Sequence, residues 1–293
     1  MSRFGYSKLH KYKAAKSRRL FLLRRFLSRR GSTQGTAAPA SQTVYWVGGG
    51  ESTSWNDTMN WASSSAGTPG YGIPGSTNPV VFDGGSSTVG PNKCVLTGAV
   101  SVAALSFTEA EAAVAAEFTQ NGKAISCTTF TYNCPTANSG EVFDGVINLS
   151  GATFTVTAAE NADHFGSGMA VSCTANVTVA SAVALAGSFA CAENFTTTAA
   201  LELGRLQLTA AKTATFSGGN DDFTLTAYTS GDWDGDASDD VTIVSDDSTT
   251  WDFVNPSSMV VSYITVEDSN ATNAIDATDN CHDGTGNTNW TFV

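Results

Sequence analysis

Residues 145–158 read GVINLSGATFTVTA, and the pattern in this stretch decides the fold class that the sequence indicates. Val, Ile, Leu and Phe alternate with Asn, Ser and Thr, which is the period of two shown by a strand with one buried face. Similar runs lie at residues 93–107, 175–187, 201–210, 222–229, 240–244 and 260–269. Gly, Asn, Asp and Ser separate them, and only residues 108–118, TEAEAAVAAEF, favour a helix or turn. We therefore predict an all-β protein.

The spacing of these runs favours a parallel β-helix, a solenoid of stacked coils, for the body of the chain at residues 94–293. Runs that end near residues 161, 181 and 213 follow one another at about 20–30 residues, a typical length for one coil. Stacking would bury Val, Leu and Phe and would cover the open strand edges. Clear two-residue hairpin turns are lacking between the runs. The alternative is an antiparallel β-sandwich or jelly roll, which shows the same alternation.

Charge divides the chain into two unequal parts. Residues 1–50 hold eleven of the fifteen Lys and Arg residues and no acid, which gives this part a net charge of +11. Residues 51–293 hold the other four basic residues and all 27 acids, which gives a net charge of −23. A part this acidic repels nucleic acid and anionic membranes. The low content of charged residues and the abundance of Thr, Val and Gly suit a β-protein or a particle component better than a typical cytosolic enzyme.

Residues 16–30, KSRRLFLLRRFLSRR, predict an extended basic arm at residues 1–30. The longest apolar run, Leu20–Leu23, is shorter than the stretch of about 7–15 residues that a secretory signal needs. A transmembrane helix needs about 20 apolar residues, so we expect no transmembrane segment. Arginines also interrupt the apolar face of a helix through this stretch, which argues against a membrane-surface helix. Residues 31–42, GSTQGTAAPASQ, predict a flexible linker.

We expect the arm to become ordered on the acidic surface of a capsid or other particle protein. Copies of the same chain are further candidate partners, and contact with nucleic acid is expected through the arm alone. The alternative is a basic tail that stays solvated. The residues expected to dock are Arg18, Arg19, Phe21, Leu23, Arg24, Arg25, Phe26, Leu27, Arg29 and Arg30.

A segment rich in Trp and Gly, residues 43–93, precedes the body. It contains Trp46-x-Gly-Gly, then Trp55, then Asn60-Trp61, and it continues through a Gly- and Pro-rich stretch to Val-Val-Phe-Asp at residues 80–83. Followed by CVLTGAVSVAALSF at residues 94–107, this pattern resembles the opening module of bacterial autotransporter-type and phage-associated β-helix proteins. The end of the chain, from VVSYITVEDS to the final Gly-Asn-x-x-Trp, is similar to the closing coil of such proteins.

The resemblance implies a parallel β-helix whose opening module caps and nucleates the coil stack, and it implies no catalysis. Trp46, Trp55 and Trp61 are large apolar residues in a Gly-rich setting, which suits a cap over the open end of the stack. An aromatic sugar-binding face is the alternative. Autotransporters are exported through a cleavable signal, and none that fits is found here. We therefore expect a component assembled in the cytoplasm, as in a bacteriophage particle.

The segment GDWDGDASDD, residues 231–240, is the best candidate ion site. Its Asp232, Asp234, Asp236 and Asp239 could surround Ca²⁺, a cation that takes about six to eight oxygen ligands in proteins. A solvated acidic turn is the alternative. No other cofactor is expected, and the three dispersed histidines form no zinc-type motif. Paired aspartates, such as those at residues 246–247, leave a glycosidase open, but without a nucleophile elbow, phosphate loop or HExxH motif we predict that the protein is not an enzyme.

Six cysteines are present, and the sequence allows either disulfides or small buried core residues. The 18-residue spacing of Cys173 and Cys191 would suit thiols stacked one above the other in successive coils. Taken together, these patterns predict a structural protein of a bacteriophage-type virion, serving as capsid decoration or cement, or as a head or tail fibre. The alternative is an exported cell-surface adhesin or glycan-binding module, which would act outside the cell.

Overall fold

The computed structural model describes residues 36–83, 93–108, 117–134, 143–159, 165, 169–179, 183–198, 200–218, 222–233 and 235–293. The predicted basic arm (1–30) and residues 31–35 of the linker lie outside these residues. Residues Thr36–Val293 form one compact unit, distinct from Met1–Gly35. The Trp-rich segment and the strands after it therefore belong to the same unit.

The chain is all-β, with about 54% of its residues in strands and about 1% in helices, which confirms the predicted fold class. Within the residues that the structure describes, the one short helix is the 3₁₀ turn η1 (Thr58–Asn60). The first strands are β1 (Val44–Trp46), β2 (Trp61–Ala62), β3 (Pro79–Phe82), β4 (Lys93–Val95), β5 (Val100–Ser101), β6 (Ala104–Phe107), β7 (Glu117–Thr119), β8 (Ile125–Cys134), β9 (Val146–Ala159), β10 (Ala170–Cys173), β11 (Val177–Val179) and β12 (Val183–Cys191). The later strands are β13 (Phe195–Thr197), β14 (Leu201–Leu208), β15 (Thr213–Phe216), β16 (Asp222–Leu225), β17 (Val241–Ser245), β18 (Trp251–Val254), β19 (Met259–Ser262), β20 (Ile264–Glu267), β21 (Ser269–Asp279), β22 (His282–Thr285) and β23 (Thr288–Thr291).

Parallel pairing dominates the described strands. Twenty-one of them belong to one hydrogen-bonded sheet, and β4 and β7 pair separately. From β9 onward, two interleaved series of parallel strands run to the end of the chain: β9–β10–β12–β14–β16–β18–β21–β23 and β9–β11–β13–β15–β17–β20–β22. Among the named strands, only β1 and β2 pair antiparallel. This large parallel sheet is compatible with a β-helix or solenoid and is not the antiparallel sandwich or jelly roll of the alternative prediction.

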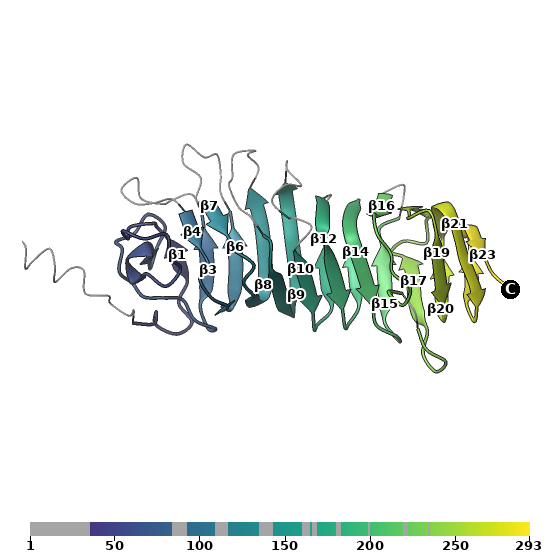
Figure 1. Cartoon of the computed structure of the whole chain (residues 1–293), viewed down its shortest axis with the longest axis horizontal. Helices are drawn as coiled ribbons and strands as arrows, with labels where there is room; N and C mark the ends of the chain where they lie inside the picture. The colour runs from purple at the N-terminus through teal and green to yellow at the C-terminus, as the bar shows by residue number, and fades with distance from the viewer. Residues whose placement is uncertain are drawn as a thin grey trace, which may run out of the picture. The chain divides into compact units, whose positions relative to one another are not determined.

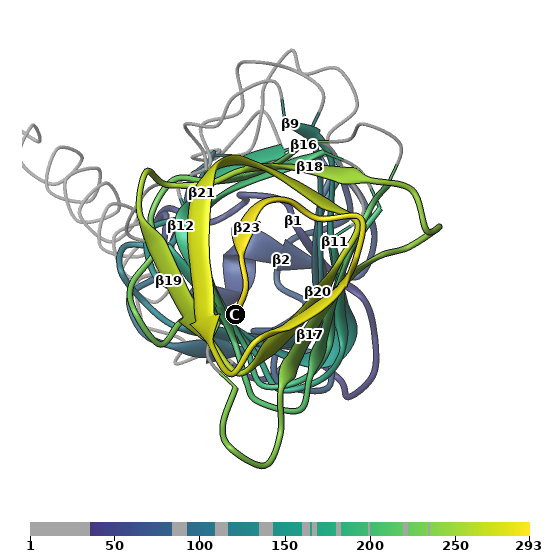
Figure 2. The same ribbon diagram turned by 90° about the vertical axis from the view of Figure 1, so that its right-hand side faces the viewer.

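The figures show how the strands follow one another in space. In Figure 1 the strands between β1 and β23 stand side by side in nearly the same order as in the sequence. Figure 2, turned by 90°, shows β12, β19, β20 and β11 arranged around a common interior. Many of the strands alternate buried and half-buried residues, as β10 and β13 do, and these strands send alternate side chains into that interior.

Aromatic columns fill much of the interior. Phe82 of β3 is the register partner of Phe107 of β6, and their rings stack with centroids 4.8 Å apart. Phe130 of β8 and Phe154 of β9 repeat the arrangement at 5.0 Å. These separations are close to the spacing of neighbouring strands, which is about 4.7–4.9 Å. Parallel register therefore places like side chains on top of one another, and each stacked pair adds about 0.5–1.5 kcal/mol beyond its area burial.

Asparagine side chains connect segments that lie 18 or 19 residues apart in the sequence. The side-chain oxygen of Asn255 accepts a hydrogen bond from the Asn273 N–H (2.8 Å), and the Asn273 amide donates to the Asn255 carbonyl (2.6 Å). The Asn194 oxygen likewise accepts from the N–H of Thr213 (2.9 Å). Each contact joins positions 18 or 19 residues apart. Backbone groups that would otherwise lack hydrogen-bond partners thus bond to a segment 18 or 19 residues away.

The structure also bears on one possible hairpin turn and on the predicted helix at residues 108–118. Asn121-Gly122 has positive φ values of 56° and 63°, as in a hairpin turn, yet the flanking β7 and β8 pair with other strands. Of the helix candidate at 108–118, residues 109–116 lie outside the described residues, and Glu117–Thr119 is strand β7.

Candidate functional site

The predicted docking residues cannot be placed. Arg18, Arg19, Phe21, Leu23, Arg24, Arg25, Phe26, Leu27, Arg29 and Arg30 all lie outside the described residues. Their role as a docking surface stays a prediction.

The three tryptophans of the opening segment do come together, in the interior. Trp46, Trp55 and Trp61 are 1%, 2% and 0% exposed. The ring of Trp61 packs edge-on against Trp46 at 5.0 Å and against Trp55 at 4.7 Å. Stacking on a sugar requires an open ring face, and none of the three rings has one. These residues therefore form a packed aromatic cluster, and the sugar-binding face that was the alternative prediction does not fit them.

A buried amide holds the backbone around this cluster. Asn60 is 0% exposed, and its side chain donates to the carbonyls of Ser52 (2.9 Å) and Ser54 (3.0 Å). Its oxygen accepts from the N–H of Gly50 (2.8 Å), and Trp61 Nε1 donates to the Trp55 carbonyl (2.8 Å). The sequence pattern singled out Asn60 without revealing this role, which depends on backbone brought back from eight residues upstream.

Of the four predicted calcium ligands, Asp232, Asp236 and Asp239 lie among the described residues. Asp232 is 1% exposed, and its carboxylate accepts hydrogen bonds from Arg205 Nε at 2.8 and 3.0 Å. Asp236 accepts from the N–H groups of Ser238 (2.8 Å) and Asp239 (3.1 Å), whereas Asp234 lies outside the described residues. In the part of the chain that the structure describes, no group of three or more His, Cys, Asp or Glu residues could hold a metal ion. The Arg205 guanidinium already neutralises Asp232, and the calcium site stays a prediction.

The Arg205–Asp232 ion pair fastens the segment between β16 and β17 onto β14. Asp232 also accepts from the Thr229 N–H (2.8 Å), and its carbonyl accepts from the Leu208 N–H (2.7 Å). Next to it, Trp233 is fully buried and donates from Nε1 to the Leu206 carbonyl (3.1 Å). The hydrogen bond with Asp232 raises the pKa of Arg205. Sequence reasoning missed this pair, although Arg205 is one of only four basic residues after residue 50.

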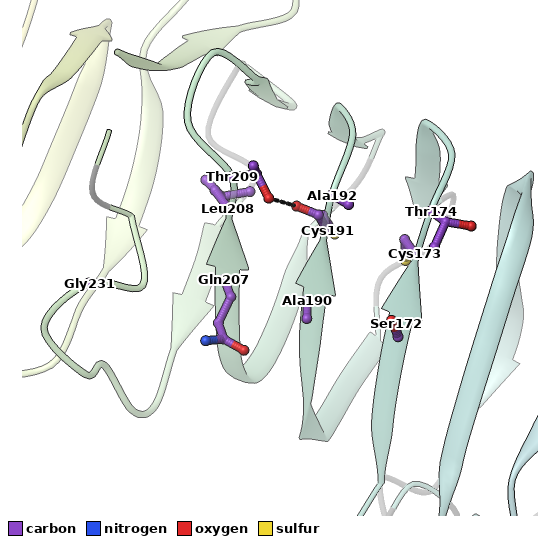
Figure 3. A pocket seen from close by; sticks show the side chains of 10 residues that line it. All are labelled: Ser172, Cys173, Thr174, Ala190, Cys191, Ala192, Gln207, Leu208, Thr209 and Gly231. Atoms are coloured by element: carbon purple, nitrogen blue, oxygen red, sulfur yellow. Dashed lines mark hydrogen bonds between the residues drawn. The ribbon is translucent and has the colours of Figure 1, made fainter. Parts of the chain in front are cut away.

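A pocket of about 300 Å³, here called the thiol pocket, opens at the ends of β10, β12 and β14. Each of these strands supplies one set of three consecutive residues, and Gly231 comes from the fastened segment (Figure 3). Thr209 donates from its hydroxyl to the Cys191 carbonyl (3.0 Å), which links the ends of β12 and β14. The lining residues are Ser172, Cys173, Thr174, Ala190, Cys191, Ala192, Gln207, Leu208, Thr209 and Gly231.

Two stacked thiols are the chemically distinctive groups of this pocket. Cys173 and Cys191 are register partners, which confirms the stacking that their spacing predicted. They are 1% and 3% exposed. A hydrogen bond with Cys173 and burial both raise the pKa of Cys191 well above its usual range, so this thiol stays protonated at neutral pH. Cys94, Cys127, Cys173 and Cys191 form no disulfide in this structure.

The thiols are the only ionisable side chains among the lining residues, which include no carboxylate, imidazole or amine. A nucleophilic cysteine needs a base or a positive charge to hold it as the thiolate. The thiol pocket supplies neither, so its geometry does not support nucleophilic catalysis.

Acidic residues concentrate toward the C-terminal end. Residues 221–293 contain 15 of the 27 acids and no Lys or Arg. Most of those whose side chains the structure describes are exposed or half-buried, and Asp232 is the buried exception. The later strands therefore present a surface of one sign of charge.

Comparison of the chain with protein-family models, curated proteins and solved structures gave no match. In the residues that the structure describes, no helix has both the length and the apolar character needed to cross a membrane.

Proposed function

We propose that this chain is a non-enzymatic structural protein of a bacteriophage-type virion, acting as capsid decoration or cement, with a fibre role as the nearest variant. In this proposal residues 94–293 are a parallel β-helix, residues 43–93 close its N-terminal end, and the basic arm attaches it to an acidic surface of the particle. The observation that carries the proposal is the division of charge, +11 in residues 1–50 against −23 in the rest.

The described strands support the scaffold part of this proposal. Long series of parallel pairs, aromatic columns and asparagine contacts 18 or 19 residues apart are what a repeated coil would produce. The aromatic cluster of Trp46, Trp55 and Trp61 is buried next to Phe82 at the start of the first parallel series, where a cap is needed. A long series of paired strands around a continuous apolar interior suits a structural role.

Charge supports the attachment part. A long cationic segment on an acidic protein is attracted to acidic grooves between capsid subunits, and the rest of the chain is repelled by them. Attraction of this kind raises the association rate and weakens with salt, whereas the apolar Phe21, Leu23, Phe26 and Leu27 would supply the buried anchors.

Deletion of residues 1–30 tests the proposal by cosedimentation with particles purified from the source. The full chain should bind at regular stoichiometry, and the truncated chain should lose binding while keeping the circular dichroism spectrum of a folded β-protein. A matched pair of variants separates charge from chain length. Changing the six arginines Arg18, Arg19, Arg24, Arg25, Arg29 and Arg30 to Gln should weaken binding strongly, and changing them to Lys should preserve most of it. Full occupancy by the truncated chain would refute the attachment.

The glycan-binding alternative was suggested by Trp46, Trp55 and Trp61, whose rings are buried and cannot stack on a sugar. It would require a different surface, and no contact of the described residues favours one.

A further inference from the structure

The strands around the thiol pocket form one column of inward-facing side chains. Cys127 of β8 pairs in register with Leu149 of β9, Leu149 with Cys173 of β10, Cys173 with Cys191 of β12, and Cys191 with Leu208 of β14. Within this column only Cys173 and Cys191 place two sulfur atoms on neighbouring strands. Cys127 has the same environment without a cysteine neighbour on β9.

We propose that Cys173 and Cys191 are an oxidation site that closes into a disulfide, covalently joining strands β10 and β12. Register partners in a sheet lie about 4.7–4.9 Å apart, which falls inside the Cα separation of about 4.4–6.8 Å found for disulfides. Their side chains point to the same side of the sheet, and the two thiols hydrogen-bond to each other. Closing the disulfide requires the two Cβ atoms to approach from the strand spacing to about 3.5–4.5 Å.

An oxidant reaches the two thiols at the ends of β10 and β12, where these strands border the thiol pocket. Both cysteines line its volume of about 300 Å³, although each is almost completely shielded from bulk solvent. A hydroperoxide such as hydrogen peroxide is small and uncharged enough to enter a pocket of this size. Thr209, whose hydroxyl donates to the Cys191 carbonyl, lies at the same end of the strands, whereas the Gln207 side chain extends away from it (Figure 3).

The reaction balances with hydrogen peroxide as the oxidant. One thiol, as its thiolate, attacks the peroxide; the O–O bond breaks, the sulfur becomes a sulfenic acid, and hydroxide takes up the released proton as water. The second thiol then attacks the sulfenic sulfur; the S–S bond forms, the S–O bond breaks, and a second water leaves. Two thiols and one peroxide thus give one disulfide and two waters.

Burial sets the rate of this reaction. The raised pKa of Cys191 keeps the thiolate scarce, so that oxidation is slow in a reducing cytosol and proceeds under sustained exposure to oxidant. Once formed, the bond would be equally shielded from reductants. The cross-link closes a loop of 18 residues in the unfolded chain and should therefore raise the unfolding temperature. This inference is independent of the proposed attachment to a particle.

The experiment maps disulfides in the intact chain after oxidation. Full-length protein, purified under reducing conditions and freed of reductant, is incubated with hydrogen peroxide, unfolded, alkylated and digested with chymotrypsin. Trypsin is unsuitable because no Lys or Arg lies between Lys123 and Arg205. Mass spectrometry should find peptides of Cys173 and Cys191 joined with the loss of two hydrogen atoms, while Cys94 and Cys127 stay alkylated. Dithiothreitol added to the unfolded, oxidised protein before alkylation should reverse the bond.

Matched variants complete the test. Oxidation should raise the unfolding temperature of the wild type and of Cys127→Ser, and it should leave that of Cys173→Ser and Cys191→Ser unchanged. Alkylation of both thiols after prolonged oxidation would overturn the proposal, and so would over-oxidation of one of them without a cross-link, or a bond to any other cysteine. The mapping uses wild-type protein, so the proposal remains testable if a serine variant fails to fold.

Discussion

At the scale of single residues, the ion pair of Arg205 and Asp232 is the polar contact with the largest expected effect on stability. Asp232 is 1% exposed, so removing its partner leaves a buried charge with only the Thr229 N–H and solvent at its edge to stabilise it. We expect Arg205→Met to lower the free energy of unfolding by about 2 kcal/mol, measured by urea denaturation.

Lys212→Met is the matched control for this substitution. It breaks the Lys212–Glu193 pair, whose side chains are 28% and 41% exposed, and pairs this exposed contribute about 0–1 kcal/mol. The double variant Arg205→Met/Asp232→Asn should regain part of the loss, because the neutral amide no longer needs a counter-charge. Equal effects of Arg205→Met and Lys212→Met would show that the pair does not fasten the segment.

The hydrogen bonds between Asp247 and Thr249 depend on pH, because they form with the ionised carboxylate of Asp247. Its carboxylate accepts from the Thr249 hydroxyl (2.6 Å) and the Thr249 N–H (3.0 Å), and these bonds lower its pKa below the ordinary value of 3.8. A depressed folded-state pKa contributes stability that is present above the unfolded pKa and is lost as pH falls through the folded pKa. NMR titration of Thr249→Val should show the pKa of Asp247 moving up toward 3.8, whereas Thr250→Val should leave it unchanged. An unchanged pKa in Thr249→Val would contradict the assignment.

At the scale of elements, a glycine permits one of the bends of a long strand. The pairing of β12 with β14 shifts register between Leu185 and Ser188, and Gly187 lies at this irregularity. A Cβ at Gly187 would overlap the carbonyl oxygen of Met169, which accepts the Ser188 N–H at 3.0 Å. The strand can turn there only because the side chain is absent.

Gly187→Val should therefore lower the free energy of unfolding by about 1–3 kcal/mol, as overpacking does in well-packed interiors. Gly98→Ala is the control, because a Cβ at Gly98 meets no atom within 4 Å, and its effect should stay within about 0.5 kcal/mol. Urea unfolding of both variants measures the difference. A Gly187→Val variant as stable as the wild type would mean that β12 can bend without this close approach.

The strands and loops also show which features could be predicted from the sequence. The period of two predicted the strands, and the 18-residue spacing predicted the contact of Cys173 with Cys191, because repeated pairing turns sequence separation into spatial neighbourhood. The predicted calcium site shows the limit of such local patterns. Local spacing of aspartates carries no information about Arg205, which lies 27 residues before Asp232 and takes up its carboxylate. The thiol pocket depends on a similarly remote loop and had no sequence signal beyond its stacked cysteines.

At the scale of the whole molecule, acidic residues lie after position 50 and basic residues are concentrated in the first 50 positions. The described strands of residues 36–293 bury their apolar side chains in a continuous interior. The last 73 residues contain Asp and Glu but no Lys or Arg. The cationic residues are left almost entirely to the first 50 positions. Specificity for an assembly would therefore come from the arm, and the strands would supply length and rigidity.

Electron microscopy of particles from the native source tests this account most directly. It predicts density for the parallel strands of this chain at regular lattice positions on the particle, with residues 1–30 ordered against acidic residues of the shell. Absence of the chain from the particle would contradict the account, as would a chain held to the shell by its strands with no density for residues 1–30.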